Sequence, residues 1–501
     1  MGTTKNYIAF DIGASNGRCM LGKFDGEKLH LETINRFDNC YIRVHNHLYW
    51  DVLGLYENIK LSLRIASRNT TDEITSIAVD TWGVDFGLLD NNGNLIGNPY
   101  CYRDPHTSGI MEEVFKVVPR WEVFNITGVQ FMTVNTLYQL MAIIRAESPA
   151  FKIAKTFLMM PDLINYWLTG RKFCEYTNAT TTQCLDATGK NWAFQMLGDL
   201  GIPVDIFPEI LKPGQIVDNI SVHVREEIGL GEIPVIAGAS HDTAAAVAAV
   251  PAYVENFAYL SSGTWGLLGV EIPEPMLTEQ VYEYNFGNEG GVFDTIRLLR
   301  NMVNMWFIQE CTRIWKLAGE DYSWEKIINM ACDARPFTAF IDTDETEFLL
   351  PENMPQAIQA YCKRTGQNVP QSKGEILRTI MESLAMNYRY SFDILTNILG
   401  TPPEVFHIVG GASRNSLLNQ FTANALGIPV AAGPSEATAL GNIIIQMIAM
   451  GDVANIQEAR SLLAVSFPTK TFEPRDMRQW DENYETFIGK TNLPPLDGES
   501  S

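Results

Sequence analysis

The chain has 501 residues, of which 46% are hydrophobic and 19% charged, a balance typical of globular proteins with substantial cores. Its formal net charge of −22, with no run of Lys or Arg, argues against a nucleic-acid partner, and no apolar run approaches the roughly 18 residues of a membrane-spanning helix. The eight cysteines form no Cys-x-x-Cys pair, so we expect reduced thiols and a cytoplasmic location.

Strand-like and helix-like segments alternate along the chain, which predicts an α/β fold. We expect strands over residues 7–11, 74–80, 84–89, 235–237, 258–261, 407–409 and 430–432. Apolar residues at helical spacing predict helices from about Ser372 to Leu399, over residues 419–426 and over residues 298–310. A boundary near Val250 would divide the chain into domains over 1–250 and 251–470, followed by a polar tail over 471–501.

The first informative segment runs from an apolar strand into Asp11 and then through a turn between Gly13 and Gly17 to Arg18, where an apolar run resumes. This pattern predicts strand, tight turn and strand. Such a turn can direct backbone N–H groups at a phosphate while Asp11 holds magnesium. We expect the two glycines to permit positive φ and close approach of the phosphate. The alternative is an ordinary glycine-bearing hairpin.

A second segment of the same kind, residues 258–268, strengthens the phosphate interpretation. Here Ser261, Ser262 and Thr264 surround Gly263, and their hydroxyl groups are suited to donate to phosphate oxygens. Two such turns in one chain predict a nucleotide-dependent phosphotransferase.

Asp242 lies where the apolar strand of residues 234–237 gives way to a small-residue turn and an Ala-rich helix. Such strand-to-helix junctions often carry function. The carboxylate can accept a proton from a substrate hydroxyl, as a general base does in phosphoryl transfer. The alternative is helix N-capping, because Asp, Ser and Thr favour that position. His241 beside it fits a structural histidine equally well.

Trp82, Gly83 and Asp85, with Tyr102 and Asp104 further along the chain, form a set suited to a polyol. A Trp ring can stack on a sugar face, and carboxylates accept hydroxyl hydrogens. The alternative is a strand turn around a buried Trp.

Two further segments fit a ligand site. Asn301 and Gln309 are eight residues apart and would share one face of the helix expected over residues 298–310, along a cleft or a solvated edge. Near the other end, a strand stops at Gly410 and Gly411, where a flat ring such as adenine can pack on backbone. The alternative for these glycines is an ordinary strand–helix turn.

In their order along the chain these segments resemble the FGGY family of carbohydrate kinases. The resemblance spans about residues 6 to 470 and is carried by residues 9–18, 80–86, 175–183, 240–243, 259–265, 288–291 and 407–411. It implies two actin-like (ribonuclease H-like) domains around a nucleotide and sugar cleft. It also implies ATP and Mg²⁺ as cofactors and phosphorylation of the 1-hydroxyl of a 6-deoxy-ketohexose. L-rhamnulose is the favoured sugar, with L-fuculose or L-xylulose as alternatives, because residues 41–47 and 286–287 depart from the family pattern.

The resemblance assigns roles residue by residue. Asp242 matches the catalytic base and Asp11 the acid near magnesium. The positions that match nucleotide contacts are Ala14, Ser15, Asn16, Gly17, Arg18, Thr264, Gln309 and Gly411. The positions that match sugar contacts are Gly83, His241, Asp242, Thr243 and Asn301. A non-catalytic ATP-binding sensor on the same fold is a remaining alternative, and Asp242 argues against it.

Overall fold

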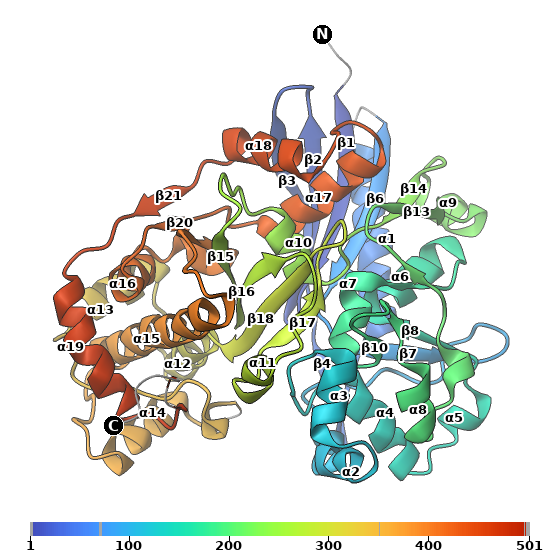
Figure 1. Ribbon diagram of the computed structural model, residues 1–501. Coiled ribbons are helices and arrows are strands. Elements are labelled where there is room, and N and C mark those ends of the chain that lie inside the picture. Colours follow the sequence, from blue (N-terminus) through green and yellow to red (C-terminus); the bar gives the residue numbers. More distant parts are fainter. Residues whose placement is uncertain (1–3, 70–72, 350, 495, 497–501) are drawn as a thin grey trace. The chain divides into compact units, whose positions relative to one another are not determined.

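The computed structural model describes residues 4–69, 73–349, 351–494 and 496 (Figure 1). The chain forms two compact units, and it passes from one to the other several times. The first unit comprises Met1–Pro251, Glu271–Leu298 and Ala437–Phe467, and the second comprises Ala252–Val270, Leu299–Glu436 and Pro468–Ser501. Of the expected tail, residues 495 and 497–501 lie outside the described part of the chain.

The first unit is built on a six-stranded sheet with the strand order β13-β14-β6-β1-β2-β3. These strands are β1 (Lys5–Ile12), β2 (Asn16–Phe24), β3 (Leu29–Asp38), β6 (Ile74–Thr81), β13 (Gln215–Asn219) and β14 (Pro234–Ala237). The three central strands β14, β6 and β1 are parallel, whereas β2 runs antiparallel to β1. Their apolar runs are buried almost throughout, as expected for parallel strands covered on both faces.

Two helices from near the end of the chain cover this N-terminal sheet. Figure 1 shows α17 (Ala437–Ala449) beside β1 and β6, and α18 (Ile456–Ser466) beside β3. The side chain of Gln446 on α17 donates to the carbonyl oxygen of Ile8 and accepts from the hydroxyl of Ser76, which ties the helix to β1 and β6. A Cβ atom at Gly441 would lie 1.7 Å from the carbonyl oxygen of Ala245 on α10 (Asp242–Ala248), so the backbones of α10 and α17 are in direct contact.

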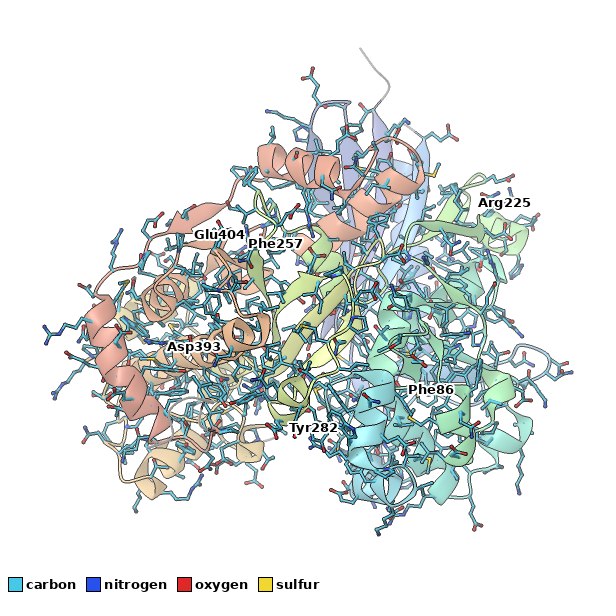
Figure 2. The ribbon with its side chains drawn as sticks, in the orientation of Figure 1. Phe86, Arg225, Phe257, Tyr282, Asp393 and Glu404 are labelled. Atoms are coloured by element: carbon cyan, nitrogen blue, oxygen red, sulfur yellow. The ribbon has the colours of Figure 1, made fainter. Side chains whose placement is uncertain are left out.

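The rest of the first unit consists of short strands and helices. They are β4 (Tyr41–Val44), β5 (His47–Trp50), α1 (Val52–Asn69), β7 (Phe86–Leu89), α2 (Ile110–Val117), α3 (Arg120–Thr127), α4 (Thr136–Arg145), α5 (Ala150–Ile153), β8 (Thr156–Met159), α6 (Met160–Thr169), β9 (Cys174–Glu175), α7 (Tyr176–Ala179), β10 (Leu185–Asp186), β11 (Asn191–Trp192), α8 (Phe194–Asp199), β12 (Ile210–Leu211), α9 (Val222–Ile228), α11 (Glu279–Glu283) and β17 (Gly287–Gly290). Aromatic rings hold them together: Phe86 packs on Phe157, and Tyr282 packs against Trp121 and Phe124 (Figure 2).

The second unit has its own sheet, in which β15 lies between β16 and β19, and β20 and β21 follow. These strands are β15 (Phe257–Ser262), β16 (Trp265–Ile272), β19 (Val405–Val409), β20 (Val430–Ala432) and β21 (Lys470–Phe472). Strand β15 is antiparallel to β16 and parallel to β19, so that Phe257 at the start of β15 lies close to Glu404 just before β19 (Figure 2). Strand β18 (Ile296–Val303) belongs to the first unit up to Leu298 and to the second unit from Leu299 on. The α-helices of the second unit are α12 (Trp306–Leu317), α13 (Trp324–Asp333), α14 (Met354–Arg364), α15 (Lys373–Leu399), α16 (Ser416–Leu426) and α19 (Met477–Ile488).

The α/β class and the expected strands are confirmed, except that the strand expected over residues 84–89 begins only at Phe86, because Val84 has left-handed φ in the preceding turn. The long helix is also confirmed, because Ser372 and Glu375 form a capping box at the start of α15 and Gly400 ends it with left-handed φ. The helix expected over residues 298–310 was wrong. Residues 296–303 form β18, and α12 begins only at Trp306. A buried strand carries a continuous apolar run, and periodicity alone does not separate such a run from a buried helix. No described helix is long and apolar enough to cross a membrane.

Gly441→Ala should destabilise the first unit because the new methyl group would overlap the backbone of α10. We expect the free energy of unfolding to fall by about 1–3 kcal/mol, the usual cost of overpacking, measured by urea denaturation. Gly198→Ala is the matched control, since no atom lies within 4 Å of a Cβ built there. Equal stabilities for the two variants would contradict the contact between α10 and α17.

Candidate active site

Three acidic residues of the first unit gather at one edge of its sheet. Asp11 near the end of β1 and Asp80 near the end of β6 are directly paired in register. Asp242 follows β14 after a short turn, and that turn is held to the sheet because Thr81 donates its N–H to the carbonyl oxygen of Ser240 at 2.9 Å. The carboxyl ends of parallel strands meet at the same edge, where α/β proteins bind their ligands.

Burial gives these acids unusual electrostatics. Asp80 is fully buried, and burial together with the nearby charge of Asp11 raises its pKa well above the usual range. Its Oδ2 accepts a hydrogen bond from Asn442 at 2.6 Å, whereas its Oδ1 has no hydrogen-bond partner in the described part of the chain. Burial also raises the pKa of Asp242, which makes its carboxylate a stronger base than an ordinary aspartate.

Asp242 remains reachable, because 32% of its side-chain surface is exposed. It is the first residue of α10, and His241 occupies the N-cap position without a side-chain capping bond. The alternative reading of Asp242 as an N-cap is therefore wrong. Its Oδ1 instead accepts from the hydroxyl of Thr243 at 3.3 Å.

His241 is enclosed by an ion pair. Arg297, which is fully buried on β18, donates from Nη2 to Glu289 at 3.0 Å and contacts Nδ1 of His241 at 3.1 Å. Burial alone would raise the pKa of Glu289, but the nearby charge of Arg297 is the main cause that lowers it, to about 2. Nε2 of His241 lies 3.4 Å from Oδ1 of Asp242.

One short segment, residues 175–181, holds the turn before Asp242. The buried carboxylate of Glu175 accepts from the backbone N–H and the hydroxyl of Ser240 at 3.0 and 2.7 Å. It also accepts from the N–H and hydroxyl of Thr177. Asn178 Nδ2 donates to the carbonyl oxygen of Ser240 at 3.1 Å. This segment therefore sets the position of the residues immediately before Asp242.

The same segment also holds the turn around Gly83. Thr181 accepts the N–H of Val84 at 3.0 Å, and a Cβ at Gly83 would lie 2.8 Å from the Thr181 hydroxyl oxygen. Gly83 is thus required here for close packing. The segments around Gly83 and Asp242, which the sequence could not relate to each other, share one support.

The structure gives Asp85 a different role from the contact with a polyol hydroxyl that its residue type suggested. It is fully buried, and its carboxylate accepts from the indole N–H groups of Trp50 and Trp82 at 2.6 and 2.9 Å and from Gln139 at 2.9 Å. Because these donors occupy both oxygens, Asp85 is an anchor for the two indole rings, which pack 4.4 Å apart, and not an acceptor for a sugar hydroxyl.

The first turn has the expected strand–turn–strand form, and β1 and β2 are paired up to Ile12 and Gly17. Its glycines differ from expectation, because neither Gly13 nor Gly17 has positive φ. Gly17 is needed for packing, since a Cβ there would lie 2.1 Å from the ring of Phe37. Within the turn, Ser15 and Asn16 are exposed and Ala14 is half-buried. Arg18 forms an ion pair with Asp11.

The second turn, in the second unit, brings together two of the predicted nucleotide residues. The hydroxyl of Thr264 at this turn donates to Oε1 of Gln309 on α12 at 3.2 Å. Gly410 packs on the same turn, because a Cβ there would lie 2.9 Å from the carbonyl oxygen of Ser262. Gly411 is exposed and has open space where a Cβ would lie. Three predicted nucleotide contacts, Thr264, Gln309 and Gly411, therefore lie at or next to one turn. Their contacts with a ligand stay predictions.

Ser262 itself was expected to offer its hydroxyl to a phosphate, but it is buried and accepts from Asn304 Nδ2 at 2.6 Å. Asn304 in turn accepts a hydrogen bond from Tyr388 on α15. Of the predicted sugar contacts, Asn301 lies on β18 in the second unit, whereas Gly83, His241 and Thr243 lie in the first.

Sequence reasoning missed the roles of several residues. Glu175 lies in a segment that carried the family resemblance, but its residue type alone did not predict five hydrogen bonds on a buried carboxylate. Arg297 offered a usable signal, because a cation within the apolar run of residues 296–299 needs a buried partner. Asn304 gave no signal, since an isolated Asn is common on surfaces.

Comparison with known proteins identifies the family of the chain. Residues 6–248 match the N-terminal domain of the FGGY family of carbohydrate kinases, and residues 258–450 match its C-terminal domain. The chain is 46% identical over 483 residues to a rhamnulokinase of Bacteroides thetaiotaomicron, which covers 96% of this chain and 99% of that protein. It is 40% identical over 465 residues to a rhamnulokinase of Oceanobacillus iheyensis, with 93% and 97% covered.

Solved structures share the fold. A gluconate kinase from Lactobacillus acidophilus superposes with a TM-score of 0.79 at 15% identity, over 97% of both chains. Plasmodium falciparum glycerol kinase with ADP gives a TM-score of 0.78 at 16% identity, over 99% of this chain and 100% of that one. The fold is therefore the two-domain fold of sugar kinases. The chain belongs to the FGGY family of carbohydrate kinases.

Glu175→Gln should lower kinase turnover, because the amide group of Gln would set N–H donors against the donors of Ser240 and Thr177. Loss of a hydrogen bond to a charged group costs about 1.5–3 kcal/mol, so we expect kcat to fall by roughly ten- to hundredfold. The control is Glu209→Gln, which removes an exposed ion pair with Arg171. Unchanged turnover in the first variant would show that the segment does not position the site.

Proposed function

We propose that the protein is an ATP-dependent kinase that phosphorylates the 1-hydroxyl of L-rhamnulose. The observation that carries the chemistry is Asp242, a carboxylate with a raised pKa and an exposed face at the sheet edge that also presents Asp11 and Asp80. The similarity to rhamnulokinases over nearly the whole chain supports the choice of sugar. A cytoplasmic location follows from the same proposal and stays a prediction.

In this proposal Asp242 accepts the proton of the sugar hydroxyl as the phosphoryl group is transferred. Burial, which raises its pKa, brings its basicity closer to that needed near neutral pH. His241 and Thr243 flank it and are the proposed sugar contacts, together with the turn at Gly83 and Asn301. The indole N–H of Trp82, the residue before Gly83, donates to Asp85 and so holds this ring in place.

The proposed nucleotide contacts lie on the two turns. Among residues 14–18 of the first turn, Ser15 and Asn16 lie at exposed positions, which suits binding of a phosphate at this turn. Thr264 and Gln309 form one polar cluster at the second turn. Gly411 presents bare backbone on which the adenine ring would pack.

The carboxylates of Asp11 and Asp80 fit a magnesium ion. They are paired in register at the ends of adjacent strands, and Asp80 Oδ1 is a buried oxygen without a partner among the described residues. Mg²⁺ prefers such hard oxygen ligands and keeps several waters and substrate phosphates in its shell. When bound, it would neutralise charge on the transferred phosphate.

Asp242→Asn should abolish turnover while leaving ATP binding unchanged, because the amide cannot accept the proton but keeps the size of the side chain. We expect kcat to fall on the order of 10²–10⁴-fold, with ATP affinity measured by calorimetry. Asp199→Asn at the end of α8 is the matched exposed control. Substantial activity in Asp242→Asn would remove Asp242 as the base.

The sugar is tested by measuring ADP release with L-rhamnulose, L-fuculose and L-xylulose side by side. We expect kcat/KM to be highest for L-rhamnulose, and the phosphate to appear on the 1-hydroxyl by NMR of the product. A site built for one hydroxyl configuration discriminates strongly against a mispaired hydroxyl. A higher kcat/KM for either other ketose would overturn the sugar assignment, and ADP release that is independent of sugar would overturn the kinase proposal.

A further inference from the structure

The imidazole of His241 connects a buried ion pair to Asp242. On one side, Nδ1 lies 3.1 Å from Nη2 of Arg297 and 3.2 Å from Oε2 of Glu289. On the other side, Nε2 lies 3.4 Å from Oδ1 of Asp242. None of the roles assigned so far uses Arg297 or Glu289.

The chemistry of Arg297 decides where the imidazole carries its proton. A guanidinium group donates only and is not deprotonated in proteins, so a nitrogen that it contacts must offer a lone pair. Nη2 has two N–H bonds, and Glu289 and Nδ1 of His241 can accept one each. If Nδ1 carried the proton instead, it could donate to Oε2 of Glu289 at 3.2 Å. A second N–H of the fully buried arginine would then be orphaned, because Nη1 already has no partner among the described residues, and the lone pair of Nε2 would face the carboxylate of Asp242.

The neutral ring therefore keeps its proton on Nε2, on the side of Asp242. The two side chains that contact the Asp242 carboxylate, His241 and Thr243, both approach Oδ1. Their hydrogens stabilise negative charge on that oxygen and hold the carboxylate in one orientation.

We propose that Arg297 and Glu289 are positioning residues that hold His241 in its Nε2-protonated tautomer, and that this tautomer fixes Asp242 so that Oδ2 receives the proton of the sugar hydroxyl. The oxygen–hydrogen bond of the sugar breaks and its proton passes to Oδ2, while the sugar oxygen bonds to the γ-phosphorus of ATP. The bond between that phosphorus and the bridging oxygen breaks at the same time, and ADP leaves with its electron pair. His241 and Arg297 keep their protons throughout. The role of Oδ2 rests on the proposed kinase function, whereas the tautomer depends on this chain alone.

The tautomer can be read directly in the wild-type protein. The chain contains seven histidines, so ¹⁵N-labelled histidine gives few side-chain signals, and the spectrum of His241→Asn identifies those of His241. We expect a protonated Nε2 and an unprotonated Nδ1 at neutral pH. A proton on Nδ1, in either a neutral or a charged ring, would overturn the proposal. This measurement requires no activity, so it is independent of whether the protein phosphorylates L-rhamnulose.

A double-mutant cycle tests whether Arg297 acts through the tautomer. Arg297→Lys keeps the charge but not the paired N–H groups, and His241→Gln places an N–H donor near the position of Nε2 without having tautomers. In the wild-type background Arg297→Lys should lower kcat by roughly ten- to hundredfold, with little effect on KM for ATP. In the His241→Gln background it should lower kcat by no more than about threefold.

Equal losses in the two backgrounds would show that Arg297 serves only the fold and would overturn its positioning role. Arg225→Lys, which changes a half-buried arginine paired with the exposed Glu232, is the matched control (Figure 2). If Arg297→Lys does not fold, the tautomer of His241 measured in the wild-type protein still tests the proposal. If the wild-type protein does not phosphorylate L-rhamnulose, the proposed function fails separately.

Discussion

The candidate site depends most on the hydrogen bonds that the buried carboxylate of Glu175 accepts. It accepts hydrogen bonds from the backbone and side chain of both Thr177 and Ser240, and Ser240 is two residues before Asp242. Burial of this charge is costly unless every oxygen is well satisfied, and here five donors satisfy it. A carboxylate held in this way fixes the turn that leads to Asp242, the proposed base.

This constraint joins parts of the chain that lie far apart in sequence. The segment containing Glu175 also holds the turn around Gly83 through Thr181, so the two turns cannot move independently. Helix α17 (Ala437–Ala449) also contacts the candidate site, because the side chain of Asn442 donates a hydrogen bond to Asp80. The packing of α17 on α10 at Gly441 then sets the backbone that follows Asp242.

The acidic character of the chain poses a problem for the binding of a nucleotide. With a net charge of −22, the protein must bind an anionic nucleotide inside a negative field. Arg18 and Arg297 are both committed to acids, namely Asp11 and Glu289. The positive potential needed at the phosphates is left to backbone N–H groups and to the proposed magnesium ion.

Much of the fold was predictable from the sequence, because apolar runs bounded by glycines define β1, β6, β14, β15 and β19. The capping box of Ser372 made α15 equally clear. Strand β18 was mistaken for a helix because burial on both faces removes the period of two. Of the candidate site, the sequence predicted Asp242 and the two turns. The sequence could not show that the carboxylate of Asp85 accepts hydrogen bonds from two indole groups, or that Glu175 holds Ser240. These hydrogen bonds join residues that are up to 35 and 65 positions apart in the chain.

The central claim is that Asp242 is the base for a sugar hydroxyl. A crystal structure with L-rhamnulose and a non-hydrolysable ATP analogue tests it most directly. The account predicts the 1-hydroxyl oxygen within about 2.6–3.2 Å of Asp242 Oδ2, the range for proton transfer. A sugar whose 1-hydroxyl lies nearest to Asp80, or beyond reach of every carboxylate, would contradict it.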